Sequence, residues 1–527
     1  MPVQTDGIFS LPTELIIHIL ACLDYKSILR CRTVCHLFDD LVKTAALLQY
    51  KVDLAVAGME DGPPSIESPA ERLQLLKKHQ EAWRSLNFKD DKIIPMLKGE
   101  VWELYGGVLA QARSSNTLSF RQLPSIMRGI EEKEWVVEAM GFEIRDFTMD
   151  PSQDLLVVIQ KPSRDSESIH VHLRVLATGA FHPAAPHPAT LSHSPQGDQY
   201  SYEIQVSLDF LGILFVCEDR VHHELVIWNW KTGAHQLWVT GRDIRSFAFL
   251  SERHVVLGLA SLPMHEDEHE DEVETLNEPE LRVIDILHVP AGQVELKDAP
   301  FICSFHYPRL LPLVIPLAFS IRSDPAPGWK PRNDLQVPFF TARDNRLLVM
   351  TFWVADLEQV HTIVLYALSS NLMSYVNSLE DASRLHLLWD QWGPDSSRIM
   401  KAPGRHSTVW VCYVFGTKFI SSDRHNVLTV YDFNLLPAKR QVAKGYSESE
   451  AIIYPANESS RISGGDIFRY DVTSRLPYST QTLKPPLAKG PGDFEAVMLS
   501  EDSLIMLTRT SSYGQDFRHR NYRILTF

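Results

Sequence analysis

The chain has 527 residues, of which 44% are hydrophobic and 22% charged, and its formal net charge is −15. These proportions are those of a soluble globular protein, and the length suggests two or more units or one large unit built from repeats. The negative charge argues against nucleic acid as a main partner, because phosphate binding needs clustered cations, and against an anionic membrane surface.

The first fifty residues predict three short helices with apolar faces. Pro12 lies where the first turn of a helix tolerates proline, and Glu14 suits the helix dipole in the same turn. Apolar residues then recur at three- and four-residue spacing, namely Leu15, Ile16, Ile19, Leu20 and Leu23. Asp24 can cap a second helix, and the spacing continues to about residue 48. Helices this short cannot cover these faces among themselves, so we expect a partner surface to cover them.

This pattern resembles the F-box, the helical module that docks on the adaptor subunit of cullin-RING ubiquitin ligases. The resemblance rests on Leu11, Pro12, Glu14, Leu15, Ile19, Leu20, Leu23, Leu29, Val34, Cys35, Phe38 and Leu41. The family often has tryptophan at Phe38, and either aromatic can fill a hydrophobic pocket. The resemblance implies the adaptor-binding residues Leu11, Pro12, Leu15, Ile19, Leu20, Leu23, Ile28, Leu29, Val34, Cys35 and Phe38. The alternative is an amphipathic hairpin that packs on its own protein.

A turn-rich linker at residues 59–68 follows the helices. A new helix opens at Ser68, with Pro69 at its first position and Glu71 three residues past the cap. Its apolar side carries Trp83, which a free spacer helix would leave exposed. We therefore expect this helix to be a strut that fixes the helical head against the rest of the chain.

From about Val101 onward the residue pattern predicts strands, because short runs of β-branched and aromatic residues alternate with clusters of turn residues. A strand-end signature recurs, in which a hydrophobic strand enters a turn near an aromatic or acidic residue. Its copies begin at Leu173, Leu225, Leu281, Thr429 and Phe468. The unit resembles a degenerate WD-repeat blade that lacks the upstream Gly-His dipeptide.

A β-propeller hides its sheet edges by radial repetition. At about forty to fifty-five residues per blade, the body holds six to eight blades, with seven as the central expectation; two β-sandwiches or a β-helix are the alternatives. The last strand, residues 522–527, would close the ring with an early strand such as Thr117–Gln122. The prediction is a multidomain chain: a small all-α F-box head at 1–50, a linker and connecting helix at 51–100, and a large all-β propeller-like domain at 101–527.

Candidate chemical motifs are few. Residues 265–269 (HEDEH) match a zinc-protease pattern, but that motif needs a helix. Here the neighbours are acidic, so we interpret the segment as a solvated acidic loop, which could attract a basic substrate or loosely hold a cation. Residues 222–224 (HHE) are expected at the surface, and Trp228 and Trp230 between blades. No phosphate loop or nucleophile elbow occurs, and we predict no catalytic residue, no metal and no cofactor.

The six cysteines show no metal-like pairing. Cys22, Cys31 and Cys35 are expected as small buried groups on the helical faces. Thiols of this kind fit a reducing compartment, the cytoplasm or the nucleus or both. No secretory signal follows Met1, and the most apolar later run, Leu310 to Ile321, is too short to cross a bilayer.

The resemblance implies a substrate receptor of a ubiquitin ligase and not an enzyme. The head would bind the adaptor and, through it, a cullin, while the β body would hold a protein target of unknown identity. One alternative is a non-catalytic scaffold outside ubiquitin transfer. Another is a propeller hydrolase or lyase, which acids and histidines on the strands nearest the axis would favour.

Overall fold

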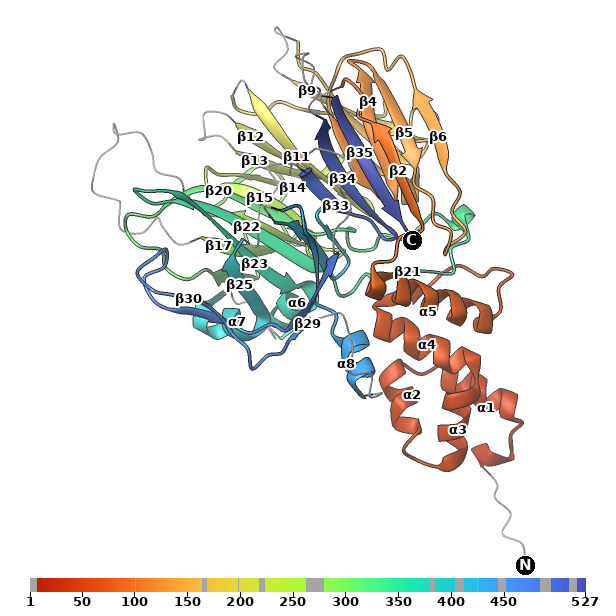
Figure 1. The fold of residues 1–527 in the computed structure, drawn as a ribbon. Helices are drawn as coiled ribbons and strands as arrows, with labels where there is room; N and C mark the ends of the chain where they lie inside the picture. The colour runs from red at the N-terminus through yellow and green to blue at the C-terminus, as the bar shows by residue number, and fades with distance from the viewer. Residues whose placement is uncertain are drawn as a thin grey trace, which may run out of the picture.

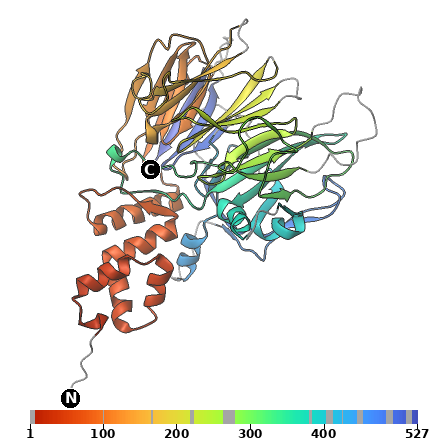
Figure 2. The same ribbon diagram turned by 180° about the vertical axis from the view of Figure 1, so that it is seen from behind.

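The computed structural model describes residues 7–99, 101–163, 168–197, 199–217, 223–261, 279–378, 384–402, 412–423, 425–443, 452–483, 494–510 and 519–527. A helical head at the N-terminus is joined to one side of a large β body (Figure 1). The view from behind shows the same separation of head and body (Figure 2). Within the described ranges, no helix is both long and apolar enough to span a membrane.

The head consists of four helices that follow a short 3-10 turn, η1 (Ile8–Ser10). They are α1 (Thr13–Ala21), α2 (Tyr25–Cys31), α3 (His36–Thr44) and α4 (Ala46–Ala57). Asp24 caps α2 as predicted, because its carboxylate accepts hydrogen bonds from the backbone N–H groups of Lys26 and Ser27 at 2.9 and 3.1 Å. Pro12 precedes α1 as its N-cap residue instead of lying inside the first turn.

The fourth helix corrects the expectation that only a partner could cover the head. A hydrophobic core of Ile16, Leu20, Ile28, Phe38, Leu41, Val42, Leu48 and Val52 joins all four helices. Leu48 and Val52 belong to α4, which therefore covers part of the apolar surface that the first three helices leave open. The remaining apolar surface is exposed.

The predicted strut is α5 (Pro69–Ser85). Its capping box is present, since the Ser68 backbone N–H donates to Glu71 Oε2 at 2.7 Å and the Glu71 N–H donates to Ser68 Oγ at 3.3 Å. One side of α5 packs on Tyr50 and Leu54 of α4, and the other places Trp83 in a core of the β body. The strut interpretation is thus confirmed.

Among the described residues, seven sheets form a seven-bladed propeller, and the β strands of each blade are as follows. Blade 1 has β3 (Trp102–Tyr105), β4 (Val108–Ser114), β5 (Thr117–Gln122) and β6 (Lys133–Val137). Blade 2 has β7 (Ile144–Asp150), β8 (Leu155–Gln160), β9 (Ile169–Val175) and β10 (Thr190–His193). Blade 3 has β11 (Tyr200–Ser207), β12 (Phe210–Cys217), β13 (Glu224–Asn229), β14 (Ala234–Thr240) and β18 (Val294–Glu295).

The remaining blades complete the ring. Blade 4 has β15 (Ile244–Phe249), β16 (His254–Leu259), β17 (Glu280–Asp285), β19 (Cys303–His306) and β24 (Leu385–Leu387). Blade 5 has β20 (Ile315–Arg322), β22 (Leu347–Ala355), β23 (Val360–Leu368) and β25 (Ser397–Lys401). Blade 6 has β26 (Val414–Phe415), β27 (Lys418–Ser422), β28 (Leu428–Asp432), β32 (Tyr478–Leu483) and β29 (Ile452–Tyr454). Blade 7 has β33 (Phe494–Leu499), β34 (Ser503–Thr510), β35 (His519–Thr526) and β2 (Asp90–Pro95).

The first strands of blades 1 to 5 contact one another in succession, as do those of blades 6 and 7, which indicates that first strands lie nearest the propeller axis. The hydrophobic cores lie between successive blades, where the inward side chains of two sheets meet. Several short helices and a pair of strands lie outside the seven blades. They are η2 (Pro151–Gln153), η4 (Asn333–Leu335), α6 (Ser369–Asn377), α7 (Trp389–Ser396), α8 (Leu436–Ala443) and the pair β30 (Ser460–Ile462) and β31 (Val472–Ser474).

The ring closes differently from the sequence expectation. The last strand β35 pairs with β2, from Asp90↔Thr526 to Pro95↔Asn521, so Thr117–Gln122 was the wrong partner. That segment is instead β5, inside blade 1. β2, which precedes blade 1 in the chain, thus supplies the outer strand of the last blade, and blade 7 joins both ends of the propeller.

The strand-end signature has a structural meaning for four of its five copies. Those that begin at Leu173, Leu225, Leu281 and Thr429 lie in β9, β13, β17 and β28, each the third strand of its blade. The copy at Phe468 was wrong, because it lies beside the separate β30–β31 pair.

A second attachment holds the head to the propeller. β1 (Met59–Asp61) pairs with β21 (Phe339–Thr341), a separate strand in the segment of the chain that connects β20 to β22 of blade 5. The first residues of the predicted turn-rich linker are therefore a strand, since residues 339–341 offer them backbone hydrogen-bond partners. In addition, Arg440 of α8 forms an ion pair with the buried Asp53 of α4.

Candidate functional site

Exposed apolar residues of the head lie before and along α1, on α2 and in the turn between α2 and α3. Leu15 and Ile19 are one turn apart on α1 and are 49% and 42% exposed. Val34, in the turn before α3, is 68% exposed. We call the six exposed residues Leu11, Pro12, Leu15, Ile19, Leu29 and Val34 the head surface. Exposed apolar residues gathered on one small domain are typical of a binding surface.

The eleven predicted adaptor-binding residues divide into surface and core. Leu20, Ile28 and Phe38 are buried in the core of the head, and Leu23 and Cys35 are half-buried. The other six form the head surface. A helical stripe identifies apolar residues, but it cannot say which of them face the rest of the domain.

Sequence reasoning missed Leu37, which is exposed on α3 next to buried Phe38. Because Val34 lies in the turn before α3, helical spacing does not relate the two residues, and the sequence carries no signal for the exposure of Leu37. The thiols were also placed incorrectly. Cys22 is exposed and Cys31 and Cys35 are half-buried, although all three were expected to be buried.

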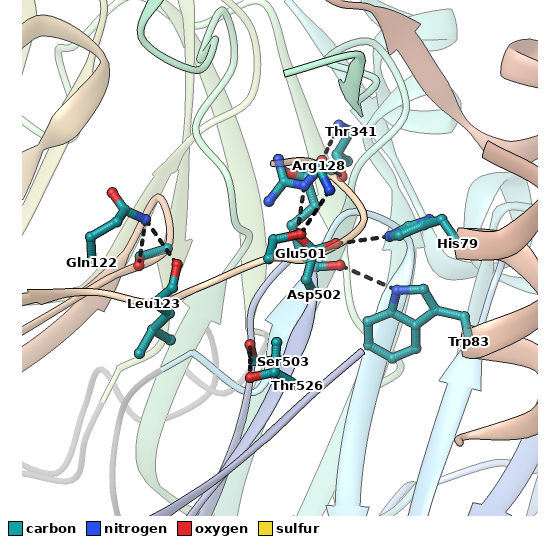
Figure 3. A network of polar contacts seen from close by, with 12 residues as sticks. His79, Trp83, Gln122, Leu123, Arg128, Thr341, Glu501, Asp502, Ser503 and Thr526 are labelled. Carbon is teal, nitrogen blue, oxygen red and sulfur yellow. Dashed lines mark hydrogen bonds and ion pairs between the residues drawn. The ribbon is translucent and has the colours of Figure 1, made fainter. Parts of the chain in front are cut away.

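A buried polar network, the α5 joint, holds the strut to the propeller; it consists of His79, Trp83, Arg128, Glu501 and Asp502 (Figure 3). Arg128 lies between the two acids, 2.6 Å from Glu501 Oε2 and 2.6 Å from Asp502 Oδ2. His79 Nε2 is 2.9 Å from Asp502 Oδ1, and the Trp83 indole N–H donates to the Glu501 carbonyl at 3.2 Å.

The pKa values of the two acids of the α5 joint are shifted in opposite directions. Burial opposes ionisation of Asp502, but the charge of Arg128 and the hydrogen bond from His79 together hold its pKa well below the ordinary value. Burial raises the pKa of Glu501, which accepts hydrogen bonds from Thr341. The head is therefore fixed to the turn between β33 and β34 by side chains that are more than nine-tenths buried.

A cavity of about 280 Å³ near the propeller axis is lined by carboxylates. Glu103 lies on β3, Asp146 on β7 and Glu203 on β11, each a first strand of its blade. Glu203 accepts a hydrogen bond from Arg322 at 2.6 Å, and Glu103 Oε1 accepts one from the Thr148 hydroxyl at 2.8 Å. The sequence placed acids mainly in loops, so this lining was missed.

Desolvation is the main cause of the pKa shifts of two of these acids. Burial raises the pKa of Asp146 to about 6 and the pKa of Glu103 well above its usual range. No histidine lines the cavity among the described residues. Throughout the described ranges, no group of three or more His, Cys, Asp or Glu side chains is arranged to hold a metal ion. A central active site would be favoured by both acids and histidines on the strands nearest the axis. The cavity has the acids, and its described lining has no histidine.

We predict that Asp146→Asn stabilises the chain at about pH 7.5 by about 2 kcal/mol. The folded-state pKa of Asp146 lies above its unfolded value, so its ionised form lowers stability above about pH 6 and has no effect below about pH 4. Thermal unfolding at a series of pH values measures the difference, which should vanish at the acid end. Asp298→Asn, at an exposed position, is the matched control. A destabilised Asn variant at about pH 7.5 would contradict the prediction.

The other sequence motifs have mixed outcomes. Trp228 and Trp230 are buried in the core between blades 2 and 3, which confirms their packing role. His223 and Glu224 are also buried, so their expected surface position was wrong. Glu224 is satisfied there by His193 at 2.9 Å and by the Trp238 indole at 3.0 Å. Residues 265–269 lie outside the described residues.

The F-box-like family model matches residues 8–54, which are η1, α1 to α3 and most of α4. The chain thus has an F-box-like helical domain followed by a seven-bladed β-propeller. A search among curated proteins finds no match.

Three solved structures are similar over much of the chain. The WD40 domain of SCAP from fission yeast is 10% identical, with 81% of this chain and 81% of that chain covered and a TM-score of 0.32. Kluyveromyces lactis Hsv2 is 9% identical, with 58% and 73% covered and a TM-score of 0.27. The polysaccharide lyase Uly1 is 8% identical, with 81% and 90% covered and a TM-score of 0.37. The scores are low, and the fold described above rests on the strand pairing of this chain.

Proposed function

We propose that this chain is the substrate-recognition subunit of an adaptor–cullin–F-box ubiquitin ligase. The head surface binds the adaptor and, through it, a cullin, and the propeller holds the target protein. The chain supplies no catalytic group. Its contribution to rate is proximity, because a tethered target presents its lysines at high effective concentration to a charged ubiquitin-conjugating enzyme.

One observation carries the proposal. The head has its own core, yet it leaves six of the residues that the F-box resemblance assigns to the adaptor exposed to solvent. Removing such a surface from water favours association. The α5 joint supports the same function, since a head held firmly to the propeller keeps the target at a constant distance from the adaptor.

The proposal divides the chain into an F-box at 1–50, a linker and connecting helix at 51–100, and a propeller at 101–527, with β2 from the linker completing blade 7. The head residues assigned to adaptor binding that are buried, Leu20, Ile28 and Phe38, then act by maintaining the shape of the head surface. All six cysteines are free, and we place the protein in a reducing compartment, the cytoplasm or nucleus.

Co-elution of the purified chain with the adaptor subunit tests the proposal. We expect wild type to form the complex and the double variant Pro12→Ala, Leu15→Ala to lose it, with the β signal in circular dichroism unchanged because both positions are exposed. Leu357→Ala, at an apolar position on the propeller that is 85% exposed, should bind as wild type does. Failure of wild type to bind would refute the adaptor role.

The same experiment separates the scaffold alternative. A receptor subunit carries the cullin into the complex when adaptor and cullin are both present, whereas a scaffold outside ubiquitin transfer retains the adaptor without it. The axial carboxylates favour one further candidate, a hydrolase or lyase with a central site. Turnover of a glycan or ester substrate that is lost in Asp146→Asn would support that candidate.

A further inference from the structure

A second cavity, of about 590 Å³, lies on the side of the propeller that carries the head. Its walls come from the β5–β6 segment of blade 1, the turn between β7 and β8, the segment before β21 and the turn between β33 and β34. The last of these turns also carries Glu501 and Asp502 of the α5 joint. The cavity therefore borders the attachment of the strut.

Part of the inner wall of this cavity is apolar, and the α5 joint supplies a polar part through Arg128, Glu501 and Asp502. In the apolar part, Leu123, Ile130, Leu176 and Trp329 are buried, and Trp135 lies closer to the rim. Trp329 packs against Tyr105 with ring centroids 6.5 Å apart, and its indole N–H has no hydrogen-bond acceptor within the described part of the chain. The apolar part of the wall favours an apolar side chain, and the volume is within the usual range for binding sites of about 300 to 1,000 Å³.

The rim of the cavity has an excess of carboxylates. Its acids are Glu131, Glu132, Asp154 and Asp334, against the bases Lys133 and Arg332. Arg332 is already held by Asp334 at 2.7 Å and lies 3.7 Å from Asp154. The Lys133 ammonium lies 5.9 Å from the centroid of the Trp135 ring. Glu131 is exposed and forms no ion pair with a described residue. Glu132 is held by Lys92 at 2.7 Å and by Arg121. The negative charge that a ligand would meet at the rim is therefore mainly that of Glu131.

We propose that this cavity holds a short segment of a target protein in which an apolar side chain stands next to a lysine or arginine. The apolar residue fills the wall around Trp329, and the basic residue meets the rim carboxylates. A protein segment satisfies both requirements because it presents the two kinds of side chain at adjacent positions. This inference rests on the proposed function, since it names the class of target and places it on the head side of the propeller.

The test selects ligands without any assumption about their source. Random twelve-residue peptides displayed on phage are selected on the immobilised full chain, in the absence of adaptor, and the enriched peptides are synthesised with a fluorescein label. Their Kd values are then measured by anisotropy against wild type, Ala177→Trp and Glu131→Lys. Ala177 is exposed at the cavity rim, so tryptophan there can occupy the cavity without disturbing a core. Ala291→Trp, at another exposed alanine away from the cavity, is the control.

We expect the enriched peptides to pair an apolar residue with a basic one and to bind both cavity variants at least about tenfold more weakly than wild type. The control should bind as wild type does. Failure to enrich any peptide, enrichment of acidic peptides, or equal affinity for Ala177→Trp would each overturn the proposal. Because adaptor co-elution is measured separately, its loss or retention reports on the proposed function and not on the cavity.

Discussion

Arg128→Met is expected to lower the free energy of unfolding by about 3 to 5 kcal/mol, because it leaves Glu501 and Asp502 buried without their cation. Hydrogen exchange along α5 should accelerate at the same time, since Asp502 also holds His79 and the Glu501 carbonyl holds Trp83. Chemical denaturation and amide exchange of the full chain measure both effects.

The matched control for Arg128 is Arg121→Met. Arg121 pairs with Glu132 and Glu134 near the surface of blade 1, where loss of an ion pair costs at most about 1 kcal/mol. The pKa of Asp502 is depressed in the folded state, so its stabilising effect is present above the ordinary carboxyl pKa and is lost as the pH falls. The difference in the free energy of unfolding between wild type and Arg128→Met should therefore decrease at acidic pH. If the two arginine variants lose equal free energy of unfolding at neutral pH, the α5 joint does not stabilise the chain more than a surface ion pair does.

Ile28→Ala is expected to destabilise the head by about 2 to 5 kcal/mol, the usual cost of truncating a fully buried aliphatic side chain. Ile28 is 0% exposed and lies in the head core, which is separate from the cores between the blades. Limited proteolysis should cut the variant within residues 13–57, and adaptor binding should fall because the head surface loses its support. The propeller should remain folded.

Val34→Ala is the control for the head, because Val34 is 68% exposed and its truncation opens no cavity. It should leave protease resistance unchanged while weakening adaptor binding. Comparison of Ile28→Ala with Val34→Ala distinguishes two causes of weaker adaptor binding, a less stable head and the loss of a direct contact. If Ile28→Ala resists protease as wild type does, the head is not held by this core.

The head was the most predictable part of the candidate site. Its helices follow from apolar spacing, and the caps at Asp24 and Ser68 follow from side chains that bond backbone groups two or three residues away. These interactions are local, so the sequence carries them directly. The same spacing could not separate Leu15 from Leu20, because both lie on the apolar stripe and only the packing of α4 and its neighbours decides which is covered.

In the propeller, too, features that depend on neighbouring residues were predicted, whereas a pairing between residues far apart in the chain was not. Strand texture predicted an all-β body of about seven blades, and four signature copies marked third strands. The closing strand was predicted incorrectly, since β35 could pair with any free strand and the correct one, β2, lies more than four hundred residues away in the chain. A residue pattern along the chain does not indicate which of several possible strands will pair with β35.

By itself, the sequence determined the F-box-like head, the strut helix, a β body of six to eight blades and the acidic charge, because each depends on periodicity, capping or composition. Tertiary structure decided which apolar residues remain exposed, where the ring closes, and that Glu103, Asp146 and Glu203 meet near the axis. It also brought Arg128, Glu501 and Asp502 together beneath the strut. These contacts join residues far apart in the chain, and their burial changes both their pKa values and their energies, which no local pattern contains.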